Sequence, residues 1–373
     1  MWQPQGFYNE YTLRTPVILS GRESVKGLYN YPASRIAIIH GSSFKDEDLF
    51  VSTFAKREID FFRRSWKEEP DFEGLRGTID AIEKFRPDVI IAVGGGSVID
   101  GSKLCRLLLE YPCFDPKTSR VSGQMLKTRF IAIPTTVGSG AEVSSAAVYY
   151  DNVNHRKDMI VLHELQPEVV VYDPRYIVDT PVKLMCASAL DAMTHILEGY
   201  VSKINNSYTD VLAEEGLLLL HEALDDIINK KDIDYQRLQY AGYIGGIVQN
   251  HCIVGAAHAI AHQLTEQGYS HGEAVSLLIP SVIRINSMNE MCKTKYEKIS
   301  ARAGFHGLDD MISFIEKVDD YIGLSNRRNR LKEWLSNAQE KQLFCENVIN
   351  DRGGKGNPVE ITDEYIRQLI GSM

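Results

Sequence analysis

Asp88-Val-Ile-Ile-Ala-Val-Gly-Gly-Gly-Ser97 is the segment that decides the fold of this chain. Its run of apolar residues predicts a strand buried on both faces, because a half-exposed strand would alternate apolar and polar side chains. The glycines that follow let the backbone approach an anion, and the next helix adds free N–H groups and the positive end of its dipole. The segment therefore predicts a strand, loop and helix that bind a phosphate group.

Two other segments have the same order. Residues 35–39 form an apolar run that ends in His40-Gly41-Ser42-Ser43, and residues 129–133 form another that ends in a Thr-, Gly- and Ser-rich loop over 134–140. Further strands are expected within 142–172. Strands that alternate with helices indicate a parallel sheet covered on both faces. The intervening helices are expected over 46–64 and 72–85.

The character of the sequence changes after about residue 176. Strand-like runs disappear, and the 3.6-residue periodicity of amphipathic helices takes over. Helices are expected over 183–202, 207–230, 235–265, 272–287, 291–304, 308–322, 328–338 and 362–371. We therefore predict an α/β, Rossmann-like domain with a parallel sheet over 1–175, and an all-α domain over 176–373.

The helical half contains a group of potential metal ligands. Asp191 and His195 are four residues apart in an Ala-rich helix, so both side chains leave one face. Such a pair alone is more often a surface hydrogen bond. His258 and His262 have the same spacing in another Ala-rich helix, which has little structural use for two imidazoles. One carboxylate and three imidazoles suit Fe²⁺ or Zn²⁺. The predicted ligands are Asp191, His195, His258 and His271, with His262 left over.

The composition is that of an ordinary soluble globular protein, with 44% hydrophobic and 24% charged residues. A net charge of −9 argues against a nucleic-acid partner. Six scattered cysteines without a C-x-x-C pair indicate reduced thiols. No apolar run of transmembrane length and no signal peptide are apparent, so we expect a cytoplasmic protein without a membrane partner.

The loop over 94–97 is neither G-x-G-x-x-G nor a Walker loop. A glycine-rich turn is often only a turn, but this one lies between a strand and a helix. A second loop of small polar residues follows the next strand. Together they favour the pyrophosphate of a dinucleotide as ligand, and the cleft between the two halves as the place for chemistry.

Five motifs in this order resemble the iron-containing, group III alcohol dehydrogenase family of the dehydroquinate synthase-like superfamily. They are G-G-G-S-x-x-D-x-x-K at 94–103, P-T-T-x-G-S-G-x-E-V at 134–143, the Asp191/His195 pair, H-A-I-A-H at 258–262 and H-G at 271–272. The resemblance spans nearly the whole chain. It implies the two-domain fold predicted above, bound Fe²⁺ or alternatively Zn²⁺, and a nicotinamide cofactor.

The resemblance also implies roles for individual residues. His262 matches the family's histidine near the nicotinamide and substrate, and it is our candidate for the proton relay because imidazole titrates near neutral pH. The metal ligands implied are again Asp191, His195, His258 and His271. The implied cofactor-binding residues are Gly95, Gly96, Ser97, Asp100, Thr135, Thr136, Ser139 and Lys157. Departures from the family pattern at Val137, Asp179-Thr180-Pro181 and Glu273 bear on the substrate.

The implied reaction is reversible hydride transfer between a nicotinamide and a small primary alcohol or aldehyde. We expect the protein to form a homodimer. Arg156, Lys157 and Lys203 would suit an anionic substrate such as phosphonoacetaldehyde or sulfoacetaldehyde. Three alternatives stay open: a glycerol dehydrogenase-like polyol oxidoreductase, a dehydroquinate synthase-like lyase that uses NAD transiently, and a metal-stapled binding protein without turnover.

The end of the strand over 36–39 predicts the choice of cofactor. NAD-binding sites commonly place an acid there to bind the ribose 2′-OH, and the resembling family typically has Asp. This chain instead has Gly41-Ser42-Ser43, with Lys45 nearby and no carboxylate before Asp46. The alternative is that this segment is only a flexible turn and the acid lies elsewhere. We expect NADP(H) to be preferred over NAD(H).

Overall fold

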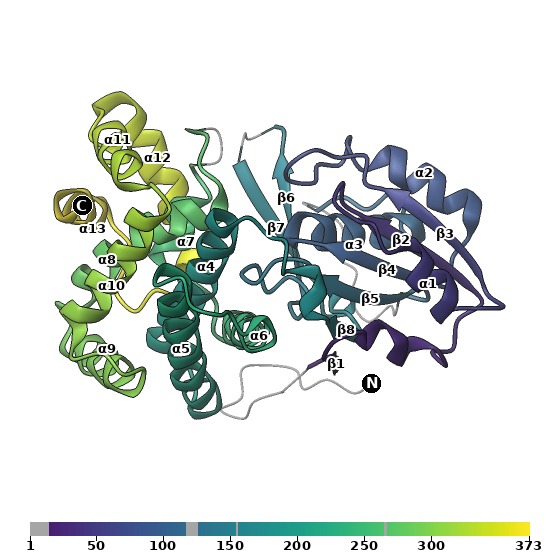
Figure 1. Cartoon of the computed structure of the whole chain (residues 1–373). Helices are drawn as coiled ribbons and strands as arrows, with labels where there is room; N and C mark the ends of the chain where they lie inside the picture. The colour runs from purple at the N-terminus through teal and green to yellow at the C-terminus, as the bar shows by residue number, and fades with distance from the viewer. Residues whose placement is uncertain (1–14, 117–125, 154–155, 265–266) are drawn as a thin grey trace.

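The computed structural model describes residues 15–116, 126–153, 156–264 and 267–373. The chain forms two halves that lie side by side, one built on a sheet and one built of helices (Figure 1). The predicted fold class, a Rossmann-like half with a parallel sheet followed by an all-α half, is confirmed. No helix in the described ranges is long and apolar enough to cross a membrane.

The main sheet has six strands, all parallel, in the order β1-β8-β5-β4-β2-β3. β4 is buried along its whole length, as its uninterrupted apolar sequence predicts. The strands are β1 (Val17–Ser20), β2 (Arg35–His40), β3 (Glu58–Arg63), β4 (Val89–Gly94), β5 (Arg129–Pro134) and β8 (Val169–Tyr172).

The strand order reverses beside β2. The chain passes from β2 outward to β3 and then returns to the other side of β2 to form β4. Open parallel sheets bind ligands at such a reversal, beyond the carboxyl ends of the strands. The loops after β2 and β4 meet there, since the Gly41 N–H donates to the Val93 carbonyl oxygen at 3.3 Å.

Three helices accompany this sheet: α1 (Glu47–Thr53), α2 (Arg76–Phe85) and α3 (Gly96–Glu110). A separate antiparallel hairpin, β6 (Ala146–Asp151) with β7 (Arg156–Val161), lies between the main sheet and the helical half (Figure 1). The hairpin therefore brings residues of the first half towards the helices.

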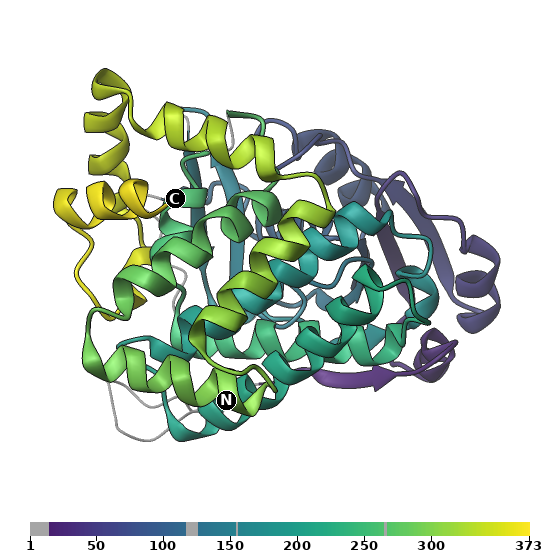
Figure 2. The same cartoon turned by 60° about the vertical axis from the view of Figure 1, so that its left-hand side comes forward.

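The helical half is arranged around α4 (Val182–Val201), which packs against α5, α6 and α8 and is buried from Met185 onward except at Ser188 (Figure 2). The other helices are α5 (Ser207–Ile228), α6 (Tyr235–Cys252), α7 (Ala256–Ala261), α8 (His271–Asn286), α9 (Glu290–Arg302), α10 (Leu308–Tyr321), α11 (Ser325–Leu335), α12 (Ala338–Asn350) and α13 (Asp363–Ser372).

The loop after β5 fixes the two halves to each other. A Cβ atom on Gly138 would lie 2.1 Å from the carbonyl oxygen of Ser188 on α4, so only glycine fits there. Gly140 has φ 61° and lies against Gly246 of α6, where a Cβ would be 2.5 Å from the Gly246 Cα. Backbone contact on both helices therefore sets the position of this loop relative to the helical half.

Three helix predictions were wrong in their extent. The helix expected over 46–64 ends at Thr53, because Lys56 has φ 76° and the following residues pair with β2 as strand β3. The helix expected over 235–265 is broken by Ile253, at φ 56°, into α6 and α7. The helix expected over 328–338 covers Ser325–Leu335, and α12, which follows it, was missed.

Candidate metal and cofactor site

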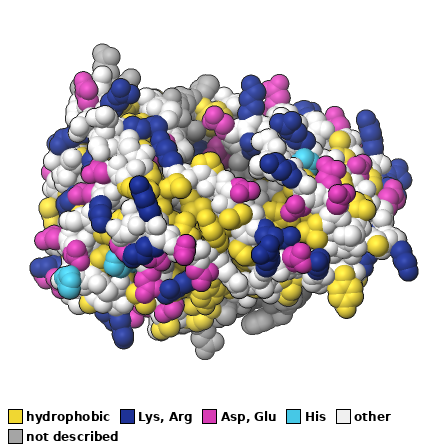
Figure 3. Space-filling view, in the orientation of Figure 1, with side chains coloured by type: hydrophobic (Ala, Val, Ile, Leu, Met, Phe, Trp, Pro, Cys, Tyr) yellow, Lys and Arg dark blue, Asp and Glu magenta, His cyan; other side chains and the backbone are white. Residues whose placement is uncertain are grey.

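A cleft of about 560 Å³ joins the glycine loop to the histidine cluster. Its lining comes from both halves and includes the ends of the loops after β4 and β5, the β6–β7 hairpin, and helices α4, α7 and α8. On the face shown in Figure 3, hydrophobic side chains gather along the middle of the molecule, where the halves meet. Of the predicted site residues, those in the lining are Gly96, Ser97, Asp100, Thr136, Ser139, Lys157, Asp191, His195, His258, His262 and His271.

Asp191 is the centre of the histidine cluster. Its Oδ1 lies 3.4 Å from His258 Nε2, 3.7 Å from His195 Nε2 and 3.7 Å from His271 Nε2. One donor atom each from Asp191, His195 and His258 falls within 4.8 Å of the others, and all three residues are buried. α4 supplies the first two, α7 the third, and His271 comes from the first residue of α8. The structure thus brings together all four residues predicted to bind the metal.

The cluster lacks a group that its buried polar atoms need. Asp191 Oδ1 and His258 Nε2 are both shielded from solvent and make no hydrogen bond within the described chain. Burial lowers the pKa of His195 to about 4 and that of His271 well below its usual value, so both are neutral and able to donate a lone pair. A carboxylate oxygen and neutral imidazole nitrogens without partners fit a divalent cation such as Fe²⁺ or Zn²⁺.

Glu198 supports the cluster from behind. Its Oε2 accepts a hydrogen bond from His258 Nδ1 at 2.7 Å, which leaves Nε2 to face Asp191. The same carboxylate accepts the N–H groups of Gly255 at 2.8 Å and Ala257 at 2.6 Å, so it also caps α7. A carboxylate that fixes the far nitrogen of a ligand histidine is a common arrangement in metal sites.

His262, the candidate proton relay, lies beside this cluster. Its ring is nearly parallel to that of His271, with centroids 5.7 Å apart. Its Nδ1 is 3.0 Å from Asp351 Oδ2, and Asp351 Oδ1 accepts the N–H of Gly353 at 2.7 Å. Burial works to raise the pKa of Asp351, but the charge of His262 and these hydrogen bonds lower it on balance. The ionised carboxylate can therefore orient the imidazole and leave Nε2 for the cleft.

The glycine loop begins α3, as predicted. A Cβ on Gly95 would lie 3.1 Å from Thr136, and one on Gly96 would lie 2.8 Å from Ser139, so the loops after β4 and β5 pack directly on each other. The Ser97 hydroxyl is held by the segment after β3: it bonds to the Glu68 carbonyl oxygen and accepts from Arg64 Nη1 at 2.8 Å. The free backbone N–H groups at the start of α3 are what remains to bind a pyrophosphate.

The other predicted cofactor residues differ in their surroundings. Asp100 lines the cleft, yet both carboxylate oxygens are bonded within the protein. Lys157 lines it too, with Nζ 2.5 Å from Glu69 Oε1. Thr135 donates its N–H to the Gly94 carbonyl oxygen. Gly41, Ser42 and Ser43 follow β2, next to the first turn of α3, since a Cβ on Gly41 would be 3.6 Å from Val98. Their roles stay predictions.

Several polar residues at this site were not predicted, among them Glu198, Asp351 and Arg352. Glu198 is three residues beyond His195, so the spacing of Asp191, His195 and Glu198 along one helix face was available in the sequence. Asp351 and Arg352 come from the segment after α12, and no local pattern connects them with His262. Conversely, exposed Lys203, considered for an anionic substrate, is not among the residues that line the cleft.

Models of known families and known relatives match this chain. The family described as iron-containing alcohol dehydrogenase matches residues 16–174, and the C-terminal part of the Fe-containing alcohol dehydrogenase family matches residues 185–373. The NADPH-dependent butanol dehydrogenase of Clostridium saccharobutylicum is 26% identical, with 95% of each chain covered. The solved structure of an iron-containing alcohol dehydrogenase from Thermococcus thioreducens has a TM-score of 0.85 and 25% identity, covering 95% of this chain and 97% of that one.

An aldehyde-alcohol dehydrogenase of Streptococcus pneumoniae serotype 4 is 33% identical over 81% of this chain. The chain spans 38% of the length of that relative. The family matches together cover both halves of the fold and confirm the resemblance seen in the five motifs. The chain belongs to the iron-containing alcohol dehydrogenase family.

Proposed function

We propose that this protein catalyses reversible hydride transfer between a nicotinamide cofactor and a small primary alcohol or aldehyde. The observation that carries the proposal is the single cleft that contains both the start of α3 and the Asp191 cluster. A dinucleotide whose pyrophosphate lies at the loop can extend along this cleft towards the cluster. A binding protein without turnover would have no use for this juxtaposition.

Asp191, His195, His258 and His271 would hold the metal, and a divalent ion there supplies Lewis acidity that polarises the substrate oxygen. The nicotinamide supplies or accepts the hydride. His262 Nε2 would exchange the proton with the substrate oxygen, while Asp351 keeps the ring oriented through Nδ1.

The test measures oxidation of NADPH and NADH with a panel of small aldehydes, on protein loaded with Fe²⁺ or Zn²⁺. Phosphate release and glycerol oxidation are followed in parallel, because they report the lyase and polyol alternatives. We expect aldehyde-dependent oxidation that disappears on chelation and returns with metal. Phosphate release without net cofactor oxidation would contradict the proposal.

We also propose that NADP(H) is preferred over NAD(H). β2 ends at His40, opposite Arg63 of β3, and the neighbouring Arg64 donates its N–H to the His40 carbonyl oxygen at 3.1 Å. The Arg64 guanidinium donates to Ser97 Oγ at 2.8 Å, at the start of α3, and a guanidinium in this position would suit a 2′-phosphate. The clostridial relative is an NADPH-dependent butanol dehydrogenase, which supports the same choice.

Gly41→Asp tests this preference. A Cβ there meets only Val98, at 3.6 Å, so a carboxylate fits without strain on the fold. We expect the ratio of kcat/KM for NADPH to that for NADH to fall by about tenfold or more, because the carboxylate repels the 2′-phosphate and binds a 2′-OH. Arg64→Gln should lower the same ratio. A wild type that favours NADH would contradict the proposal.

Two proposals concern the architecture. We propose that the domain boundary lies between residues 175 and 176, within the segment that joins β8 to α4, and limited proteolysis at this segment tests it.

We also propose a homodimer, because β1 is an edge strand of the main sheet and Val17 is 62% exposed. Light scattering on the purified chain measures the oligomeric state.

A further inference from the structure

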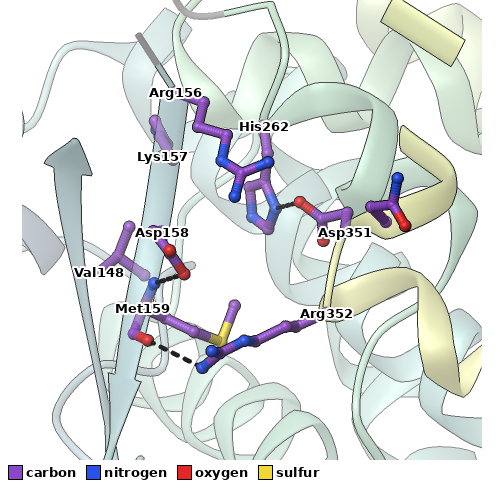
Figure 4. A pocket seen from close by; sticks show the side chains of 9 residues that line it. Val148, Arg156, Lys157, Asp158, Met159, His262, Asp351 and Arg352 are labelled. Carbon is purple, nitrogen blue, oxygen red and sulfur yellow. Dashed lines mark hydrogen bonds and ion pairs between the residues drawn. The ribbon is translucent and has the colours of Figure 1, made fainter. Parts of the chain in front are cut away.

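A small cavity of about 80 Å³ adjoins the cleft on the side of His262 (Figure 4). Lys157, Met159, His262 and Arg352 line both spaces, so the cavity continues the cleft past the proposed proton relay. The lining residues come from the β6–β7 hairpin, from the residue that follows α7, and from the end of α12 and the segment beyond it. A substrate that reacts beside His262 would have its far end here.

Arg156 and Arg352 approach this cavity from opposite sides (Figure 4). Within the described residues, the Arg156 guanidinium forms no ion pair with a carboxylate and donates no hydrogen bond. Arg352 donates one long bond, from Nη1 to the Met159 carbonyl oxygen at 3.5 Å. The two guanidiniums therefore offer most of their N–H donors to whatever enters the cavity.

Of the two acidic residues in the cavity lining, Asp351 has both carboxylate oxygens bonded and Asp158 has one. Asp351 is bonded to His262 and to the Gly353 N–H, and Asp158 Oδ1 accepts the N–H of Met159 at 2.8 Å. Lys157 is paired with Glu69. Neither acid forms an ion pair with Arg156 or Arg352 in the described chain, so two cationic groups have no direct counter-ion.

The position of Arg352 is tied to that of the proton relay. Asp351 holds His262 with one carboxylate oxygen and the Gly353 N–H with the other, which fixes the backbone on both sides of Arg352. A short, fixed segment thus places the oriented imidazole and a guanidinium without a carboxylate partner at one end of the cleft. Because these groups are already held in place, little conformational entropy is lost when an anion binds.

We infer that this cavity receives a negatively charged group at the far end of the substrate, a carboxylate, sulfonate or phosphonate, held between Arg156 and Arg352. The inference rests on the proposed function and narrows its substrate to small anionic aldehydes and the corresponding alcohols. In the reaction, a hydride from the nicotinamide adds to the carbonyl carbon and the oxygen gains a proton. The anionic group makes and breaks no bond; guanidiniums orient it by paired hydrogen bonds.

The experiment compares matched substrates that differ in this charge: succinic semialdehyde against butanal, with sulfoacetaldehyde and phosphonoacetaldehyde as further arms that distinguish the anions. The variants are Arg156→Gln and Arg352→Gln, and the control is Lys355→Gln. Lys355 is exposed and lies in the same segment as Arg352 but outside the cavity lining, so this substitution removes a positive charge without changing the cavity. The second readout is calorimetric binding of phosphonoacetate, an unreactive anion, to the metal- and cofactor-loaded protein.

We expect kcat/KM to favour the anionic aldehyde, and either arginine variant to lower that preference by about 10- to 100-fold, the cost of a lost charge-assisted hydrogen bond. The kcat/KM for butanal should fall much less than that for the anionic aldehyde, and phosphonoacetate binding should weaken in parallel with the lost preference. Lys355→Gln should leave both readouts as in the wild type.

Two results would overturn the inference while the proposed function stands: a wild type indifferent to charge, or a preference for anions that both variants retain. If no aldehyde is reduced at all, the proposed function fails, and phosphonoacetate binding alone decides the inference. Binding that both variants lose then supports the cavity as an anion site, and absence of binding overturns it.

Discussion

Two buried clusters of charged residues face the same cleft and differ in whether their polar atoms have hydrogen-bond or ion-pair partners. In the Asp100 cluster, Lys103 Nζ donates to Asp100 at 3.2 Å, to the Ser144 carbonyl at 3.1 Å and to the Ala146 carbonyl at 2.5 Å, while Asp100 also accepts the Val148 N–H at 3.1 Å. Every donor and acceptor has a partner. In the Asp191 cluster, the facing carboxylate oxygen and imidazole nitrogen have none within the described chain.

This difference separates structural from functional burial of charge. Leaving a buried polar atom unpaired costs roughly 1–3 kcal/mol, so unpaired atoms of a carboxylate and an imidazole that face one another indicate a group that binds both. The Asp100 cluster ties α3 to the β6–β7 hairpin and needs no ligand. The Asp191 cluster is complete only with a cation. Removing a residue from each should therefore have different consequences.

The largest effect is expected at His258. His258→Ala should lose the bound metal and lower kcat by about 10³-fold or more, the rate equivalent of the several kcal/mol that a Lewis acid supplies. Metal content by mass spectrometry and steady-state rates measure this. His262→Ala is the matched control, since it should keep the metal and lose only rate. Full metal occupancy in His258→Ala would remove this residue from the ligand set.

Lys103→Met should instead lower the free energy of unfolding. It leaves Asp100 buried without its cation, and breaking such a pair costs about 3–5 kcal/mol. Denaturant unfolding should show this loss, with one metal per folded chain retained. The double variant Asp100→Leu with Lys103→Met should recover much of the stability, because no unpaired charge remains. If Lys103→Met unfolds no more easily than the wild type, the satisfied cluster is not a structural tie.

Glu198→Gln comes next and tests how far the metal site extends. The amide can still accept one N–H at the start of α7, but it no longer holds His258 Nδ1 with a charge. Loss of such a supporting carboxylate typically weakens metal affinity by about 10- to 100-fold. Competition with a chelator measures the affinity. Glu215→Gln, which removes an exposed carboxylate from α5, is the control and should leave it unchanged.

The two clusters also show how far sequence reasoning reaches. Asp191 and His195 were predicted as a pair because helical spacing puts them on one face, and the structure does place them around one point with His258. Asp351 was out of reach, since its contact with His262 joins residues that are 89 apart along the chain. The segment of β3 was wrongly predicted as helix. Its conformation is decided by pairing with β2, a tertiary contact that the local sequence does not show.

The smallest effect, about tenfold per pH unit, is a dependence of metal affinity on pH, and it should come from the Asp191 cluster and not from the Asp100 cluster. Burial lowers the pKa of His258, but the nearby carboxylates of Asp191 and Glu198 outweigh this and raise the pKa to about 9 in the metal-free protein. Below that pH His258 carries a proton that the metal must displace, whereas His195, with a pKa of about 4, is already neutral. Affinity for Zn²⁺ should therefore fall about tenfold for each unit that the pH is lowered from about 8 to about 6.

Chelator competition, corrected for the titration of the chelator itself, measures this slope. In Glu198→Gln the pKa of His258 should lie lower, so the slope should appear only at lower pH. A flat profile in the wild type would mean that His258 is neutral before the metal arrives, and that Asp191 and Glu198 do not hold its proton.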